Sequence, residues 1–211
     1  MKILALSDAH KDYRKVNIPK ADILIFAGDI DVYKYDQEFN DFNDWLGSLK
    51  QIKHKIVIAG NHDGYFEDRG YQYIKDHLTN ATYLENSGII IDGIKFYGSP
   101  ITPTFLDWSF MKERGKAINE YWSLIPRDID ILITHGPAFG ILDTERTGKS
   151  VGCEDLLKRV LEIKPKIHIF GHIHASYGHI KTDYTDFYNV SVMNEDYDLV
   201  NKPTEIIYER Q

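Results

Sequence analysis

Short, uninterrupted runs of apolar residues recur along the chain and are separated by stretches of mixed polarity. Each run is three to five residues long and rich in Ile, Leu and Val; the runs span 3–6, 23–27, 56–59, 131–133 and 167–170. Runs this short, without alternation of polar residues, are typical of strands that are buried on both faces. The polar member of the last run, His168, sits inside a predicted strand and is therefore expected to be a satisfied histidine of the core or of an interface, not a ligand.

Apolar residues at helical spacing lie between these runs. The segment 36–51 predicts an amphipathic helix whose apolar face is formed by Phe39, Phe42, Leu46 and Leu49. A second helix is predicted over about 153–164, with an apolar stripe of Leu156, Leu157, Val160 and Leu161. The segments 82–98, 177–190 and 204–209 indicate further short strands, the first of them as a meander. Strands and helices interleaved in this way predict an α/β sandwich with mixed sheets.

Polar residues of unusual type follow each buried run directly. They are Asp8 and His10, then Asp29, then Asn61, His62 and Asp63, then His135, and finally His172 and His174. Because the carboxyl ends of neighbouring strands open on one crevice in an α/β sheet, we expect these side chains to converge. The convergence is the strongest functional signal in the sequence.

The converging side chains offer carboxylates, imidazoles and an amide oxygen, and no thiolate. This donor set suits divalent Mn, Fe, Zn, Co or Ni, whereas Ca²⁺ prefers oxygen ligands alone. The groups outnumber the ligands of one four-coordinate ion, so we expect two ions with one carboxylate bridging them. The single cysteine, Cys153, excludes an intramolecular disulfide and a zinc site built from cysteines.

Composition and charge limit the partners. The chain has 211 residues, 43% of them hydrophobic, which predicts a single domain over residues 1–211. It carries 25 Lys and Arg against 32 Asp and Glu, a net charge of −7, which disfavours long nucleic acid and anionic lipid. A phosphate ligand would need local positive charge, which two divalent ions supply. No apolar run is long enough for a membrane span or a signal peptide, so we expect a cytoplasmic protein.

Five motifs in order resemble the calcineurin-like metallophosphoesterases. They are Asp8-Ala9-His10, Gly28-Asp29, Gly60-Asn61-His62-Asp63, His135, and Gly171-His172-Ile173-His174. A closer resemblance is to the small metallophosphoesterase-domain family that includes cyclic nucleotide phosphodiesterases, through residues 133–137, 151–153 and 166–174. The resemblance implies an αββα sandwich, in which helices flank two mixed sheets and a dinuclear metal site lies at the carboxyl ends of strands.

The resemblance also implies a role for each residue. Asp8, His10, Asp29 and His174 would hold the first metal, and Asp29, Asn61, His135 and His172 the second, with Mn²⁺ as the expected ion. Asp29 would bridge the ions, and a hydroxide shared between them would attack phosphorus in line with the leaving oxygen. His62 would stabilise the developing charge or protonate the leaving oxygen. Because an imidazole commonly has a carboxylate partner, Asp63 is expected to orient His62.

Departures from sister families favour a phosphodiesterase. Ser/Thr protein phosphatases carry an Arg shortly after the Gly-Asp motif, but residues 30–34 contain none, and Tyr33 falls one position too late for the tyrosine ligand of purple acid phosphatases. We expect a small phosphodiester substrate, such as a cyclic nucleotide. A phosphomonoesterase or protein phosphatase of the same fold, a nuclease or lipid-headgroup hydrolase, and a metal-binding interaction module of low activity are the alternatives. Substrate groups are expected from loops 11–20, 99–110 and 138–150, with Arg14 and Arg146 as candidates.

Overall fold

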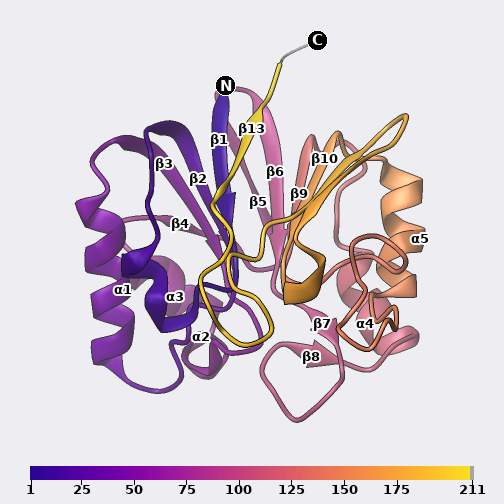
Figure 1. Ribbon diagram of the computed structural model, residues 1–211, viewed down its shortest axis with the longest axis horizontal. Coiled ribbons are helices and arrows are strands. Elements are labelled where there is room, and N and C mark those ends of the chain that lie inside the picture. Colours follow the sequence, from indigo (N-terminus) through magenta and orange to yellow (C-terminus); the bar gives the residue numbers. More distant parts are fainter. Residues whose placement is uncertain (210–211) are drawn as a thin grey trace.

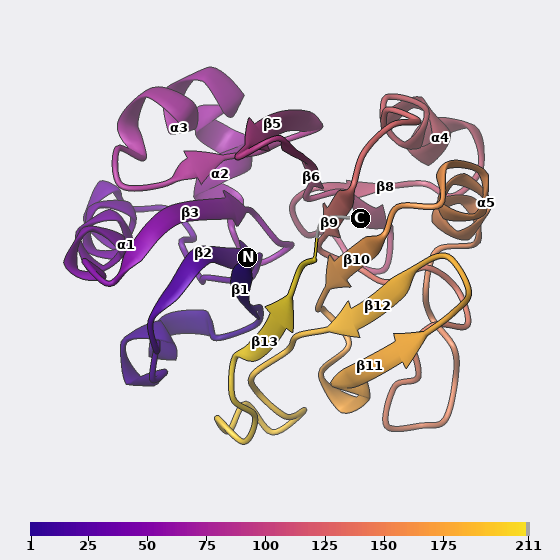
Figure 2. The ribbon, with the colours of Figure 1, turned by 90° about the horizontal axis from the view of Figure 1, so that it is seen from above.

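Two large β-sheets lie face to face in the computed structural model, which describes residues 1–209, and helices cover their outer faces (Figure 1). Helices α1 (Asp36–Ser48) and α3 (Tyr71–His77) lie beside one sheet, and α4 (Lys116–Trp122) and α5 (Glu154–Ile163) beside the other. The view from above shows the same four layers (Figure 2). The predicted αββα sandwich is confirmed.

The first sheet contains the three N-terminal buried runs. Its order is β13-β1-β2-β3-β4, with bounds β1 (Lys2–Leu6), β2 (Ala21–Ala27), β3 (Ile52–Ile58), β4 (Thr82–Tyr83) and β13 (Thr204–Ile207). Strands β1 to β4 are parallel, and β13 closes the edge antiparallel to β1. The connections carry the short helices η1 (His10–Lys15) and α2 (Gly64–Arg69).

The second sheet contains the two remaining runs. Its order is β11-β12-β10-β9-β6-β5, with bounds β5 (Ser87–Ile91), β6 (Ile94–Ser99), β9 (Ile131–Thr134), β10 (Ile167–Phe170), β11 (Gly178–Lys181) and β12 (Asp186–Asn189). The inner four strands are parallel and both edge strands are antiparallel. A small pair, β7 (Thr102–Pro103) and β8 (Met111–Lys112), and the turn η2 (His174–Ser176) lie outside it.

Burial on both faces explains the uninterrupted apolar runs. In β1, Ile3 and Ala5 pack into the core between the sheets, while Leu4 and Leu6 pack on the other side, in the cluster that contains Phe42 of α1. Side chains alternate between the two faces of a strand, so a strand in the middle of four layers needs apolar residues at every position.

Two details of the sequence prediction are wrong. Segment 82–98 is not one meander, because β4 pairs in parallel with β3 while β5 and β6 form a hairpin in the other sheet. In α5, Leu161 is 44% exposed and Ile163 is buried with Leu156 and Val160. A rotation of about 100° per residue places positions four and seven after Leu156 on its face, and position five well away from it.

Parallel strands carry both sets of site residues to the same side of the molecule. The carboxyl ends of β1, β2 and β3 meet those of β9 and β10, and the backbone links the two sheets, since Ser7 N, after β1, donates to Val190 O, after β12, at 3.0 Å. Ser7, after β1, forms an isolated bridge with Ser191, after β12. The residues that follow these strands therefore gather where the two sheets come together. Within residues 1–209, every helix is too short or too polar to cross a lipid bilayer.

His168 is a fully buried histidine of β10, as predicted for a core position, but its Nδ1 has no hydrogen-bond partner among the described residues. Its Nε2 lies 2.8 Å from Thr134 Oγ1, and its ring packs against Phe170 and Phe187. Burial lowers the pKa of His168 from 6.5 to about 3. Below pH 6.5 the unfolded chain therefore binds a proton at this histidine that the folded protein does not bind. The free energy of unfolding falls as the pH falls.

We expect His168→Gln to reduce the sensitivity of the fold to acid. Between pH 7 and pH 5 the wild type should lose about 2 kcal/mol of unfolding free energy through this residue, and the variant should not. Urea unfolding at the two pH values measures the difference, with the exposed His77→Gln as control. An equal pH dependence in wild type and H168Q would contradict this account of His168.

Candidate metal centre

Unusual backbone conformations mark the loops that leave the strands. Five residues there have left-handed φ angles: Asp8 (54°), His10 (45°), Asp29 (57°), Asp31 (67°) and His172 (68°). Residues with a side chain adopt this region at a cost, and such residues gather at functional sites, where surrounding contacts hold them. The conformations turn side chains from successive loops inward on one point.

Three groups of side chains that could hold a metal ion come together at this point. One joins His10 with Asp31 and His62, and the other two consist of predicted ligands. Ligand atoms of Asp8, His10 and His174 lie within 4.8 Å of one another, and so do those of Asp29, His135 and His172. Asn61 joins the group of Asp29, because its Oδ1 lies 2.9 Å from His135 Nε2. The structure thus brings together the four residues predicted for the second metal and three of the four predicted for the first, and it groups Asp29 with the second set alone. The binding of metal by these residues, and the bridging role of Asp29, stay predictions.

Three of the histidines are oriented by acceptors outside the centre. His10 Nδ1 lies 2.8 Å from Asp31 Oδ1, His135 Nδ1 2.9 Å from Ala27 O, and His174 Nδ1 2.9 Å from Asn194 O. A carboxylate or carbonyl accepts from Nδ1–H, which leaves the Nε2 lone pair free toward the centre. Metal-binding histidines are characteristically held in this way.

An unsatisfied imidazole nitrogen indicates that the centre fits a cation. Among the described residues, His10 Nε2 is buried and has no hydrogen-bond partner. A buried polar atom without a partner costs about 1–3 kcal/mol, and a metal ion would satisfy a free imidazole nitrogen. With ionised carboxylates beside it, this nitrogen and oxygen donor set fits divalent transition metals.

Charge governs the pKa values at the centre. Burial alone would raise the pKa of Asp29, but the charges of His135, His62 and His10 and a hydrogen bond from His135 lower it well below its usual range. Burial opposes protonation of His135, yet Asp29 and Asp8 raise its pKa to about 9. The Asp8 and Asp29 carboxylates therefore stay ionised, and positive charge nearby stabilises them. Bound metal ions would supply that charge in place of the histidine protons.

Two glycines of the motifs are required by close packing on the carboxylates. A Cβ on Gly60 would overlap the Asp29 carboxylate and lie 2.7 Å from His135 Cε1. A Cβ on Gly171 would overlap the carboxylate of Asp8 and the hydroxyl of Ser7. A side chain at either position would displace a candidate ligand.

Asp63 does not orient His62, and this part of the sequence prediction is wrong. Asp63 is fully buried; its Oδ1 accepts from Ile30 N at 3.0 Å and Val32 N at 3.3 Å, and its Oδ2 from Gly60 N at 2.8 Å. Burial and the charge of Asp29 raise the Asp63 pKa to about 7, against these backbone bonds. Asp63 instead ties the loop after β2 to the loop after β3.

The partners of His62 are residues that the sequence analysis did not assign to the site. His62 Nδ1 lies 2.6 Å from the Tyr33 hydroxyl and 3.4 Å from Asp31 Oδ1. Asp31 also holds His10, so it serves two imidazoles at once. The available signal was a second carboxylate two residues after Asp29, in the loop that leaves the same strand.

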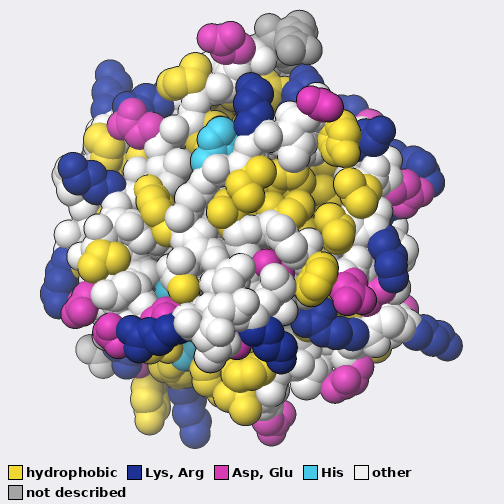
Figure 3. Space-filling model, turned by 45° about the vertical axis from the view of Figure 1, so that its right-hand side comes forward, with side chains coloured by type: hydrophobic (Ala, Val, Ile, Leu, Met, Phe, Trp, Pro, Cys, Tyr) yellow, Lys and Arg dark blue, Asp and Glu magenta, His cyan; other side chains and the backbone are white. Residues whose placement is uncertain are grey.

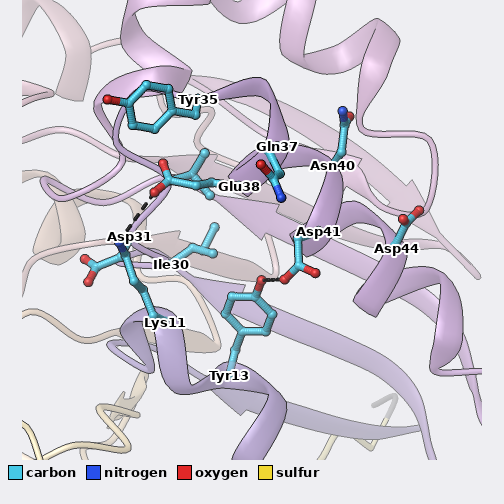
Figure 4. Close-up of a pocket in the computed structure, with 11 residues that line it drawn as sticks. Lys11, Tyr13, Ile30, Asp31, Tyr35, Gln37, Glu38, Asn40, Asp41 and Asp44 are labelled. Carbon is cyan, nitrogen blue, oxygen red and sulfur yellow. Dashed lines mark hydrogen bonds and ion pairs between the residues drawn. The ribbon is translucent and has the colours of Figure 1, made fainter.

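Two hollows adjoin the centre, and their linings differ. A cleft of about 550 Å³ between η1 and α1 is lined by Asp31, Glu38, Asp41 and Asp44, with Lys11 paired to Glu38 and Tyr13 to Asp41 (Figure 4). With four carboxylates in its lining, this cleft would repel a phosphate group more strongly than the other hollow, which has two. The other, of about 380 Å³, is lined by Tyr33, Asn61, His62, Gly64, Glu67, Asp107, Trp108 and Ser109, and we call it the His62 pocket.

The two arginine candidates are occupied elsewhere. Arg14 forms an ion pair with Asp41 at 2.7 Å, and Arg146 pairs with Glu195 at 3.0 Å and Asp196 at 2.9 Å. The loop 99–110 does reach the site, since Trp108 lines the His62 pocket.

Comparisons with known proteins agree with the geometry. The family model described as Calcineurin-like phosphoesterase matches residues 1–176. Metallophosphoesterase domain-containing protein 1 of Homo sapiens is 38% identical, over 97% of this chain and 70% of that protein. A UPF0046 protein of Caenorhabditis elegans is 35% identical, over 96% of this chain and 73% of its own length.

A solved structure shows the same fold at low identity. It is described as GAP50, the anchor in the inner membrane complex of Plasmodium, and has a TM-score of 0.56 at 13% identity, covering 98% of this chain and 77% of that one. The match of the family model over most of the chain decides the assignment. The chain belongs to the calcineurin-like phosphoesterase family.

Proposed function

We propose that the protein is a dinuclear metal-dependent phosphodiesterase that acts on small phosphodiesters such as cyclic nucleotides. The observation that carries the proposal is the assembly of two candidate ligand groups next to His62 and its pocket. We further propose Mn²⁺ as the ion, while a single domain and a cytoplasmic location stay predictions.

Different residues would hold the metal ions and donate the proton during hydrolysis. Two bound divalent ions would supply positive charge to the phosphoryl group and acidify the attacking water. Asp8 and Asp29, both buried, hold that charge in place between the sheets. His62 donates from Nε2 to the leaving oxygen as its bond to phosphorus breaks, because its Nδ1 is engaged by Tyr33.

The lining of the His62 pocket supports a diester in preference to a monoester. Of the described residues that line it, Glu67 and Asp107 are acidic and none is Lys or Arg. A monoester dianion gains most from extra cations, whereas a diester carries one negative charge and a second organic group. The aromatic rings of Tyr33 and Trp108 offer that group an apolar surface.

The alternative functions have less support. On the face drawn in Figure 3, Lys and Arg are scattered among acidic and apolar side chains, which disfavours a nuclease that tracks a long backbone. An interaction module of low activity would need no general acid beside the ligands, and here His62 is 13% exposed at the wall of a pocket.

Hydrolysis of bis(4-nitrophenyl) phosphate should require metal and exceed that of 4-nitrophenyl phosphate. In protein stripped of metal and reloaded with Mn²⁺, we expect kcat/KM to favour the diester by about tenfold or more. Asp29→Asn should lower turnover on the order of 10³-fold, since the charge stabilisation at stake is several kcal/mol.

The exposed Asp76→Asn is the matched control and should leave both rates unchanged. A preference for the monoester would replace the diesterase with a phosphomonoesterase. Two metals bound without turnover of either ester would favour the interaction module.

Asp31→Ala should weaken metal binding although Asp31 is not a predicted ligand. The Asp31 carboxylate fixes the His10 ring through Nδ1, and loss of such a partner lowers metal affinity about 10–100-fold. Calorimetric titration of metal-free protein with Mn²⁺ measures the effect, beside Asp12→Ala, which removes an acid paired with Lys15. Equal affinities in the two variants would show that Asp31 does not support the centre.

A further inference from the structure

We propose that Tyr33 is a positioning residue, which fixes the His62 imidazole so that Nε2 faces the leaving oxygen of the substrate. The inference rests on the proposed function, in which His62 is the proton donor. It concerns a residue outside the five motifs, in the loop that connects β2 to α1.

The Tyr33 hydroxyl is the hydrogen-bond partner of His62 Nδ1, and Asp31 Oδ1, at 3.4 Å, is a longer contact of the same nitrogen. The backbone N–H of His62 donates to Asp29 Oδ1 at 2.9 Å, which fixes the main chain but not the ring. The ring packs edge-on against Trp108 and His10, with centroid distances of 4.3 and 5.0 Å. Packing alone does not distinguish the two ring nitrogens, whereas the 2.6 Å contact with the Tyr33 hydroxyl engages Nδ1 specifically.

Tyr33 is itself held in place for this contact. Its backbone N–H donates to Glu38 Oε2 at 3.2 Å, and the preceding residue, Val32, donates to the buried Asp63. Burial and the charge of Asp31 raise the pKa of Tyr33 well above its usual range, so the hydroxyl stays protonated and neutral. A neutral hydroxyl accepts from Nδ1–H without adding charge beside the metal centre.

Proton transfer balances with Tyr33 unchanged. When it is protonated, His62, whose pKa is lowered by burial, donates Nδ1–H to the Tyr33 oxygen and presents Nε2–H to the substrate. As the bond between phosphorus and the leaving oxygen breaks, its electron pair stays on that oxygen, which takes the Nε2 proton. Neutral His62 then retains Nδ1–H, still directed at Tyr33, with Asp31 Oδ1 at 3.4 Å. The pair resembles the way a catalytic imidazole is oriented by a partner at its other nitrogen.

The test compares substrates that differ in their need for a proton. A cyclic nucleotide such as 2′,3′-cyclic AMP releases an alkoxide, whereas methyl 4-nitrophenyl phosphate releases a phenolate that leaves without protonation. With Mn²⁺-loaded protein, we expect Tyr33→Phe to lower kcat on the cyclic nucleotide on the order of tenfold, with KM within about twofold, and to change kcat on the nitrophenyl diester by less than about twofold.

Two further variants isolate the role. Tyr35→Phe alters a neighbouring tyrosine that is 64% exposed and should behave like wild type on both substrates. His62→Gln should show the same selective loss as Tyr33→Phe but a larger one, and adding Tyr33→Phe to it should cost nothing more. Nitrogen NMR of the metal-free protein should show the His62 ring resonances shifted in Y33F and unshifted in Y35F.

Other results would overturn the inference. An equal loss on both substrates, or a loss that adds fully to that of His62→Gln, would show that Tyr33 acts elsewhere. A His62 ring unaffected by Y33F would show that the contact does not orient it. If wild type hydrolysed neither diester, the proposed function would fail, and the NMR comparison would still decide whether Tyr33 fixes His62.

Discussion

The buried negative charge of Asp8 and Asp29 is the constraint on which the rest of the centre depends. Both carboxylates lie between two apolar sheets, where an unpaired ion costs several kcal/mol. Histidines from the opposite sheet face them: His174 Nε2 lies 3.6 Å from Asp8 Oδ1, and His135 Nε2 3.3 Å from Asp29 Oδ1. The two sheets are therefore joined by carboxylate–imidazole pairs as well as by apolar packing. Divalent ions could take the place of the histidine protons in balancing the carboxylate charge.

The surrounding loops are shaped by this charge. Left-handed backbone at Asp8 and Asp29 turns the carboxylates inward, and Gly60 and Gly171 leave room for their oxygens. Backbone amides help to hold them, since His62 N donates to Asp29 and His172 N donates to Asp8. Features that would each destabilise an ordinary loop are thus held in place by one shared set of contacts.

Support for the centre comes from groups at very different distances in the chain. Asp31 is two residues from Asp29 and holds His10, whereas Asn194 holds His174 from twenty residues away through a backbone carbonyl. Every residue has a backbone carbonyl, so the sequence cannot show which carbonyl accepts a hydrogen bond from a histidine of the centre. The same holds for Ala27, whose carbonyl orients His135.

The sequence by itself determined the layers and the gathering of the ligand groups. Runs that are apolar at every position require strands covered on both faces, and polar motifs at the ends of parallel strands must meet. It did not determine the roles of Asp63 and Tyr33. Asp63 follows His62 in the chain, but its oxygens turn to the amides of Ile30, Val32 and Gly60, while Tyr33 reaches His62 from another loop. Only the tertiary structure decided these pairings, because a hydrogen bond depends on the direction in which each loop presents its side chains, and that direction is set by packing between segments distant in the sequence.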